Sequence, residues 1–272
     1  MIDPDYSHPE KEKAIAKADA KLKGFFQSQR VEVSRAIGKH LKAKKASADK
    51  DAEQRADEII ASLSWAVWDG LVPDFQDLLG STGTEAVSIA MEALEDAEAG
   101  RDVFSLSKET VMEYARNRAA EMVGRKWVDG VLVDNPNAQW AITSSTREYL
   151  RELVCDALNS SWTPSVLAQK IDESIAFGSY RAELIARTET AMAYTAATVD
   201  VGKRVGATTK TIQMSNLHDV DDVCDAAHEA GEVPIDKPYP GGSLHVPLHP
   251  NCRCVEMVHV PKKGNVNGGA TE

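Results

Sequence analysis

The sequence predicts a mainly α-helical protein that ends in a small α+β module. Apolar residues recur at helical spacing over most of the chain, and strict alternation appears only near the C-terminus. Between the two alternating segments lies a stretch that is rich in Pro and Gly and holds most of the histidines and cysteines. We therefore expect extended N-terminal helices, a helical subdomain, and then short strands and Pro/Gly-rich loops with a zinc staple. The expected division is a helical N-terminal region at 1–105, a second domain at 106–260 whose metal-binding part is 207–260, and a flexible tail at 261–272.

Length and composition exclude several classes of protein. The 272 residues allow one large or two modest domains, and 43% hydrophobic with 27% charged residues is ordinary globular usage. Four cysteines are too few for a disulfide framework. The chain has no run of 18 apolar residues, and its first ten residues lack an apolar signal segment, so we expect neither a membrane span nor secretion. We expect the protein to be made and kept in a reducing cytoplasm.

The N-terminal third is split in charge. Residues 1–50 carry 12 Lys and Arg against 7 Asp and Glu, whereas residues 51–102 carry 2 against 13. A Lys-rich arm of this kind can dock on an acidic partner or on a phosphate backbone. The simpler alternative is the solvated face of a helix, which commonly carries such charge. We favour the solvated face, and expect residues 1–105 to meet partner subunits.

Amphipathic helices are predicted for residues 52–100, where apolar residues recur at helical spacing. We expect a break between residues 70 and 83, because Pro73, Gly80 and Gly83 are turn-forming residues. An aromatic group at the same place is predicted to pack in the core rather than to face a partner. Its members are Trp65, Trp68 and Phe75.

The next helix is predicted at 108–128. Ser107 stands in the N-cap position and Gly130 is placed to end the helix. The apolar residues at 131–133 predict a short strand before an Asn-Pro-Asn turn.

Two further helix starts carry cap signals. Ser145 and Glu148 have the spacing of a capping box, and apolar residues follow at helical period. Thr163 is the second predicted cap, with Pro164 at the first helical position, where a missing amide costs nothing. Gly178 is expected to stop that helix.

A longer helix and two strands complete the prediction. The helix is expected at 180–205, with Ser179 as its cap and Gly206 as its end. The apolar period then changes from 3.6 to 2 at 209–214, and again at 255–260, which predicts a strand at each place.

The segment between these strands holds the metal-capable side chains. Three of the four cysteines and five of the seven histidines fall within residues 218–259. The candidate ligands form two clusters, Cys224 with His228 (C-x3-H) and His249 with Cys252 and Cys254 (H-x2-C-x-C). A tetrahedral zinc site needs four ligands, commonly from two such clusters. Cys252 and Cys254 would point to opposite faces of a strand, so both can bind one ion only if the chain turns at 251–254. His245 is a spare candidate.

Zinc has a physical role in a segment of this composition. So many Pro and Gly residues leave little apolar side chain to hold the loops, and a structural metal supplies folding free energy that such a core cannot. The alternative is that the cysteines are small buried hydrophobes and the histidines hydrogen-bond to loop carbonyls. The acidic residues Asp219, Asp221 and Asp222 lack the spacing of an EF-hand and are expected in a solvated loop.

Glu189 lies at the edge of the apolar stripe of the predicted helix at 180–205. A carboxylate there needs a charged or hydrogen-bonding partner, because unpaired burial would destabilise the fold. Arg187 is about 200° away around the helix and is placed to pair with Glu183 instead. Arg181, Arg253 or loop amides are the better candidates for Glu189. We favour a structural tether between helix and loop, made by Arg187, Glu189 and Arg253, over a catalytic acid.

Three segments together resemble a known family. They are R-A-E-L-I-A-R-T-E at 181–189, D-V-C-D-A-A-H at 222–228 with Gly231 shortly after, and P-L-H-P-N-C-R-C at 247–254. In this order they resemble the phage Mu protein F-like minor head proteins, also called head morphogenesis proteins. The resemblance covers residues 110–260 and nothing of 1–105.

The resemblance implies a non-enzymatic structural protein of a tailed bacteriophage. Such proteins are associated with the portal and act in head assembly, with a further implied part in DNA packaging or delivery. The implied partners are the portal protein, the major capsid or scaffolding protein, and phage DNA, with no membrane. The implied location is the interior of the phage head near the portal, after assembly in the host cytoplasm.

The resemblance also implies a metal site at Cys224, His228, His249, Cys252 and Cys254. Two departures leave open which four of these residues bind the ion. The family's tryptophan after the R-T-E helix is absent from residues 210–215, and Cys224 is followed by a histidine rather than by a second cysteine at C-x2-C spacing.

Two other functions remain as alternatives. One is a metal-dependent hydrolase, a nuclease or peptidase acting in the capsid, with Glu189 or Asp222 as base. The other is a DNA-binding module built on the Lys-rich N-terminal arm with Lys262 and Lys263. The sequence has no phosphate-binding loop, no elbow serine motif and no zincin motif, so other common hydrolase classes have no support.

Overall fold

The computed structural model describes residues 9–43, 51–93, 100–217 and 223–261. Most of this chain is helical, and the strands form two small sheets. The elements in order are α1 (Pro9–Ala43), α2 (Ala52–Ala61), the 3-10 helix η1 (Ala66–Gly70), α3 (Leu71–Ala93), α4 (Gly100–Met122), β1 (Arg125–Val128), β2 (Val131–Asp134), α5 (Ile142–Asn159), α6 (Pro164–Glu173), η2 (Ile175–Phe177), α7 (Ser179–Arg204), β3 (Thr209–Gln213), α8 (Val223–Glu229), β4 (Val233–Pro234) and β5 (Val255–His259). None of the described helices is long and apolar enough to cross a membrane.

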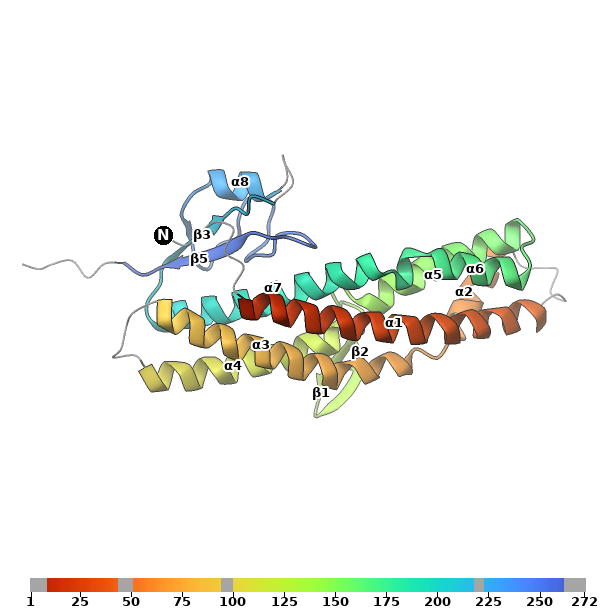
Figure 1. Cartoon of the computed structure of the whole chain (residues 1–272), viewed down its shortest axis with the longest axis horizontal. Coiled ribbons are helices and arrows are strands. Elements are labelled where there is room, and N and C mark those ends of the chain that lie inside the picture. The colour runs from red at the N-terminus through yellow and green to blue at the C-terminus, as the bar shows by residue number, and fades with distance from the viewer. Residues whose placement is uncertain (1–8, 44–50, 94–99, 218–222, 262–272) are drawn as a thin grey trace, which may run out of the picture.

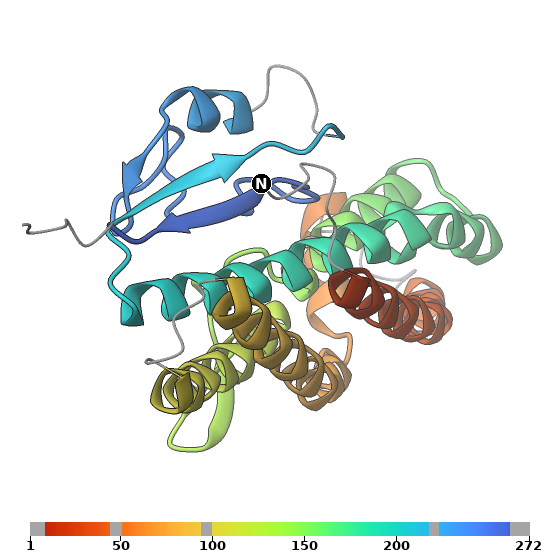
Figure 2. The ribbon, with the colours of Figure 1, turned by 60° about the vertical axis from the view of Figure 1, so that its left-hand side comes forward.

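Helix α7 lies at the centre of the molecule. It packs against α1, α3 and α4 on one side and against β5 on the other. Figure 2 shows this helix running between the helical bundle and the C-terminal module, which consists of β3, α8, β4, β5 and their loops. Helices α5 and α6 extend the bundle beside the C-terminal end of α1 (Figure 1). The predicted fold class, mainly α with a small C-terminal α+β module, is therefore confirmed.

The Lys-rich helix α1 is part of the bundle. Its buried stripe joins the same core as residues of α3, α5 and α7. The stripe consists of Ile15, Ala18, Leu22, Phe26, Val33 and Ile37. Several lysines on its outer side lie in ion pairs, including Lys21 with Asp74 of α3 (2.6 Å) and Lys23 with Asp19 (2.6 Å). The predicted division at residue 105 falls inside α4, and the helices on either side of it share one core.

The aromatic group packs in this core, as predicted. Trp68 and Phe75 are buried, and Trp65 packs against the core from a partly exposed position. Phe25 of α1 meets Trp68 edge to face, with ring centroids 4.9 Å apart. Such pairs are favourable because the positive ring edge faces the negative ring surface.

Helix α3 is continuous through the residues at which a break was predicted. Gly80 and Gly83 lie on the face that meets α4, so the two helices approach closely there. A Cβ atom at Gly83 would lie 3.0 Å from the Cβ of Val111. The helices are interrupted only at the start of the predicted interval, where η1 ends at Gly70 and α3 begins at Leu71. The turn predicted at Gly80 and Gly83 was wrong, because these glycines serve helix packing rather than chain reversal.

Helix α4 is followed by a β-hairpin instead of continuing to residue 128. Gly124 adopts a positive φ of 75° and ends the helix. Asp129 and Gly130 also have positive φ, which is the geometry of a two-residue hairpin turn between β1 and β2. The strand predicted at 131–133 is confirmed as β2, but Gly130 belongs to its turn. Ser107 is buried within α4 and is not a cap.

The cap signals of the next helices have mixed outcomes. Thr163 caps α6 as predicted, with its hydroxyl oxygen accepting from the amide of Val166 at 3.3 Å. Helix α5, however, begins at Ile142, so Ser145 lies in its first turn and accepts a hydrogen bond from Arg181 at 2.7 Å. The capping box is therefore absent, because the Ser145 hydroxyl lies inside the helix, where it donates to the carbonyls of Ala141 and Ile142.

The end of α6 and the start of α7 differ slightly from the prediction. Helix α6 ends at Glu173, before the 3-10 turn η2, and Gly178 is the N-cap of α7 in place of Ser179. The long helix itself is confirmed within one residue at each end. Gly206, with φ of 91°, follows it.

The C-terminal module is built on an antiparallel sheet of order β4-β3-β5. Both predicted strands are confirmed, and their register runs from Thr209 opposite His259 to Gln213 opposite Val255. Helix α8 packs on β3, and a small core lies beneath it. That core consists of Ile212, Cys224, Ala227, Tyr239, Val246, Leu248, Cys252 and Cys254.

Candidate metal centre

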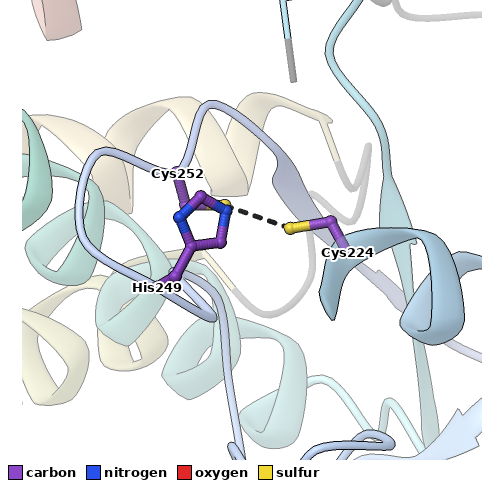
Figure 3. A group of neighbouring side chains, drawn as sticks. All are labelled: Cys224, His249 and Cys252. Carbon is purple, nitrogen blue, oxygen red and sulfur yellow. Dashed lines mark hydrogen bonds between the residues drawn. The ribbon is translucent and has the colours of Figure 1, made fainter. Parts of the chain in front are cut away.

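Cys224, His249 and Cys252 meet in the C-terminal module. Cys224 lies at the start of α8, and the other two lie in the loop before β5, which we call the ligand loop (residues 247–254). One ligand atom from each residue lies within 4.8 Å of the other two (Figure 3). These residues are far apart in the sequence, and the packing of α8 against the loop brings them together. The arrangement is compatible with a shared metal ion.

The ligand loop turns as a shared site requires. Asn251 adopts a positive φ of 63°, and the amide of Cys252 donates to the carbonyl of His249 at 3.2 Å. The strand begins only at Val255, so Cys252 and Cys254 are not forced onto opposite faces of a sheet. This is the turn at 251–254 on which the sequence prediction depended.

The three thiols of the module are buried, and all are free of disulfides. The sulfur atoms of Cys224 and Cys252 are 3.6 Å apart, and Cys254 is a hydrogen-bond neighbour of both. Hydrogen bonds from Cys224 and Cys254 lower the pKa of Cys252, and the bond to Cys252 raises the pKa of Cys224. The cluster therefore favours a thiolate at Cys252, which is the form that binds metals.

Two histidines of the segment have other partners. The Nδ1 atom of His228 lies 3.2 Å from the carbonyl oxygen of Ile212 in β3, and His228 is not among the three residues that meet. His245 pairs with the buried carboxylate of Glu256 at 2.7 Å. Of the C-x3-H pair, only Cys224 is among the three residues that meet. Asp219, Asp221 and Asp222 lie outside the described residues.

The ligand loop is fastened to α7 by Thr188. The amide of Asn251 donates to the Thr188 hydroxyl at 2.9 Å, and that hydroxyl donates in turn to the carbonyl of Leu184 at 2.8 Å. The tether between helix and loop was predicted at Arg187, Glu189 and Arg253, whereas the hydrogen bond to the loop comes from Thr188, which lies between the first two. Thr188 was missed because a helical threonine carries no signal of a distant partner.

Glu189 connects α7 to α4. Both of its carboxylate oxygens accept from Arg118, which donates from Nε at 2.8 Å and from Nη2 at 2.7 Å. Arg118 also donates to Glu121 at 2.6 Å and to the carbonyl of Gln139 at 2.9 Å. Burial alone would lower the pKa of Arg118, but the carboxylates of Glu189 and Glu121 together outweigh burial and raise that pKa. The partner predicted at Arg181 or Arg253 is Arg118.

Arg187 points to a third element. Its guanidinium pairs with Glu183 at 3.6 Å, as predicted, and with Glu12 of α1 at 3.7 Å. Three consecutive residues of α7 therefore contact α1, the ligand loop and α4 respectively. The segment R-T-E, which is part of the first family-like segment, is the place where these parts of the molecule are joined.

Comparison of the chain with protein-family models, curated proteins and solved structures finds no match.

Proposed function

We propose that this protein is a minor head protein of a tailed bacteriophage, associated with the portal and acting in head assembly and in DNA packaging or delivery. One observation carries the proposal. The three segments that resemble the phage Mu protein F-like family lie together, because Thr188 of the first bonds Asn251 of the third, and Cys224 of the second contacts Cys252 of the third. Segments that form one physical unit are more specific evidence than three separate matches.

We further propose that the metal is Zn2+ and that its role is structural. Thiolates and imidazole are the ligands of structural zinc, and Cys224, His249 and Cys252 would supply three of them. Cys254, whose thiol neighbours the other two, is the fourth candidate. A fully protein-ligated ion of this kind leaves no position for water and holds the loops of the module together.

Metal analysis of the full-length, freshly purified and reduced protein tests this site. We expect about one zinc ion per chain, as for a single structural site. Cys224→Ser and Cys252→Ser should lose most of the zinc, whereas Cys155→Ser, on α5 and outside the module, should retain it. His249→Ala should lose zinc and His228→Ala should keep it. Zinc content near zero in the unaltered protein, or full retention of zinc in the Cys252 variant, would refute the proposed structural zinc site.

The head-protein assignment has its own test. Particles purified from cells that produce the phage should contain this chain at low copy, and affinity capture of the tagged chain should enrich the portal protein. Substitutions on the outer face of α1 are the right probes of partner binding, because α1 is part of the core and its deletion would disturb the bundle. Mature heads that lack the chain, together with procapsids that lack it, would refute the assignment.

A DNA-binding role receives less support from the N-terminal helix. Lysines of α1 such as Lys21 and Lys23 are already paired with carboxylates, which leaves less free positive charge for phosphates. Strong retention on DNA that falls steeply with salt would favour that alternative.

A hydrolase would need an open metal position. An absorption spectrum of the cobalt-substituted protein distinguishes a site with four protein ligands from one with three protein ligands and a water.

A further inference from the structure

A second candidate site lies between the helical bundle and the C-terminal module. Its residues on α7 follow Thr188 in the sequence, and none of the cysteines lines it. It is a cleft of about 470 Å³. Its lining combines α4, α7, the loop after β2 and the loop before the ligand loop, through Tyr114, Glu121, Trp140, Met192, Leu244 and His245.

Trp140 is the most unusual residue of this lining. The residue is 49% exposed although tryptophan is large and apolar, and its backbone has a positive φ of 52°. A non-glycine residue in the left-handed region is strained, and such strain persists only where neighbouring structure enforces it. Among the described residues, no aromatic ring or cation is recorded on the Trp140 ring. The ring is held at the cleft with its surface available.

The polar side of the cleft is negative. Arg118 lines it too, but Glu189 and Glu121 both bind the guanidinium, so the three residues carry one net negative charge. The Arg118 side chain is almost fully buried, and four of its five N–H donors bind Glu189, Glu121 and the carbonyl of Gln139, so it offers little to an anion. At the module side of the cleft, His245 binds the buried Glu256 carboxylate at 2.7 Å, and the charge of Lys210 interacts with the same carboxylate.

Tyr114 adds an unused hydrogen-bonding group. Its hydroxyl is buried and makes no hydrogen bond with any described residue. Burial and the neighbouring Glu189 carboxylate raise the pKa of this phenol, so it stays neutral. Buried tyrosine hydroxyls normally have a partner, and here a donor from a ligand would supply one.

We propose that this cleft binds a basic side chain, arginine above all, from a partner protein. An aromatic surface attracts a guanidinium through its quadrupole, and the apolar walls at Met192 and Leu244 suit the methylene stem of such a side chain. The net negative charge of the Arg118 group attracts the head, and the Tyr114 oxygen accepts from it. The inference goes beyond the proposed function and does not depend on the metal.

The test is a titration of the 15N-labelled full-length protein with N-acetyl-arginine amide, followed by NMR on the indole N–H signals of its five tryptophans. Trp140→Phe assigns the Trp140 signal. We expect this signal to shift with saturation while those of the other tryptophans move little. N-acetyl-citrulline amide has the same shape without the charge, and its affinity should be lower by at least about fivefold.

A pair of charge variants completes the test. Glu121→Gln should weaken binding of the arginine amide about fivefold, whereas Glu113→Gln, an exposed carboxylate on the same helix, should leave it unchanged. An unmoved Trp140 signal, or equal binding of the citrulline and arginine amides by the unaltered protein, would overturn the proposal. Neither result bears on the zinc content or on the presence of the chain in phage particles.

Discussion

The ion pair between Arg118 and Glu189 makes a quantitative prediction about stability. Both side chains are 4% exposed, so removing one partner leaves a charge in a place that water does not reach. Breaking a buried pair in this way costs about 3–5 kcal/mol. The two single substitutions should differ, because their leftover charges have different neighbours.

The structure ranks the two costs. After Glu189→Leu, Arg118 keeps the Glu121 carboxylate and the Gln139 carbonyl, so we expect a loss of about 3 kcal/mol. After Arg118→Met, Glu189 keeps no described hydrogen-bond partner, so we expect a loss of about 5 kcal/mol. The double variant removes both charges and should lie within about 2 kcal/mol of the unaltered protein.

Urea unfolding followed by far-UV circular dichroism measures these differences at neutral pH. The pair of Asp200 and Arg204 on the surface of the same helix is the control, and Asp200→Asn should cost no more than about 0.5 kcal/mol. If both single substitutions cost less than about 1 kcal/mol, the pair is not the buried connection described above. A double variant less stable than either single one would also refute the argument.

Other substitutions separate packing, capping and metal effects. Gly83→Ala should destabilise the fold by about 1 kcal/mol, since the clash with Val111 outweighs the gain in helix propensity. Gly80→Ala should be neutral or stabilising, because its neighbour is the flexible thioether of Met112. Thermal unfolding of the two variants measures the sign of each change. Thr163→Ala should cost about 1 kcal/mol through loss of the cap of α6, and equal stability in urea would contradict that role. Removal of the proposed zinc by a chelator should lower the melting temperature while the helical signal of the folded protein changes little, because the bundle has its own core. A large loss of helix at low temperature would contradict a metal whose effect is confined to the module.

Local signals predicted the parts of the fold that depend on local physics. The helix α7, the strands β3 and β5 and the Thr163 cap follow from periodicity and from side chains that act within one turn. The turn predicted at Gly80 and Gly83 failed for the opposite reason, since their role is set by a neighbouring helix. The β-hairpin after Gly124 was hidden because the apolar pattern of α4 continues into β1.

The candidate metal centre could be predicted in composition but not in membership. The density of cysteine and histidine marked the segment, and the turn at Asn251 was recognised as a requirement. Spacing could not decide that His228 would face a carbonyl of β3, since that depends on how α8 packs. The pairing of Glu189 with Arg118 spans 71 residues, a separation at which a single sequence holds no signal.

Because Arg187, Thr188 and Glu189 each reach a different part of the molecule, α7 has a fixed rotational phase. A one-residue insertion earlier in the helix would turn these side chains by about 100°. It would detach the first helix, the cysteine-bearing loop and the neighbouring long helix in a single event, and no compensating change at any one of the three could restore the other two. Length changes in this protein are therefore expected in its connecting loops and not within this helix.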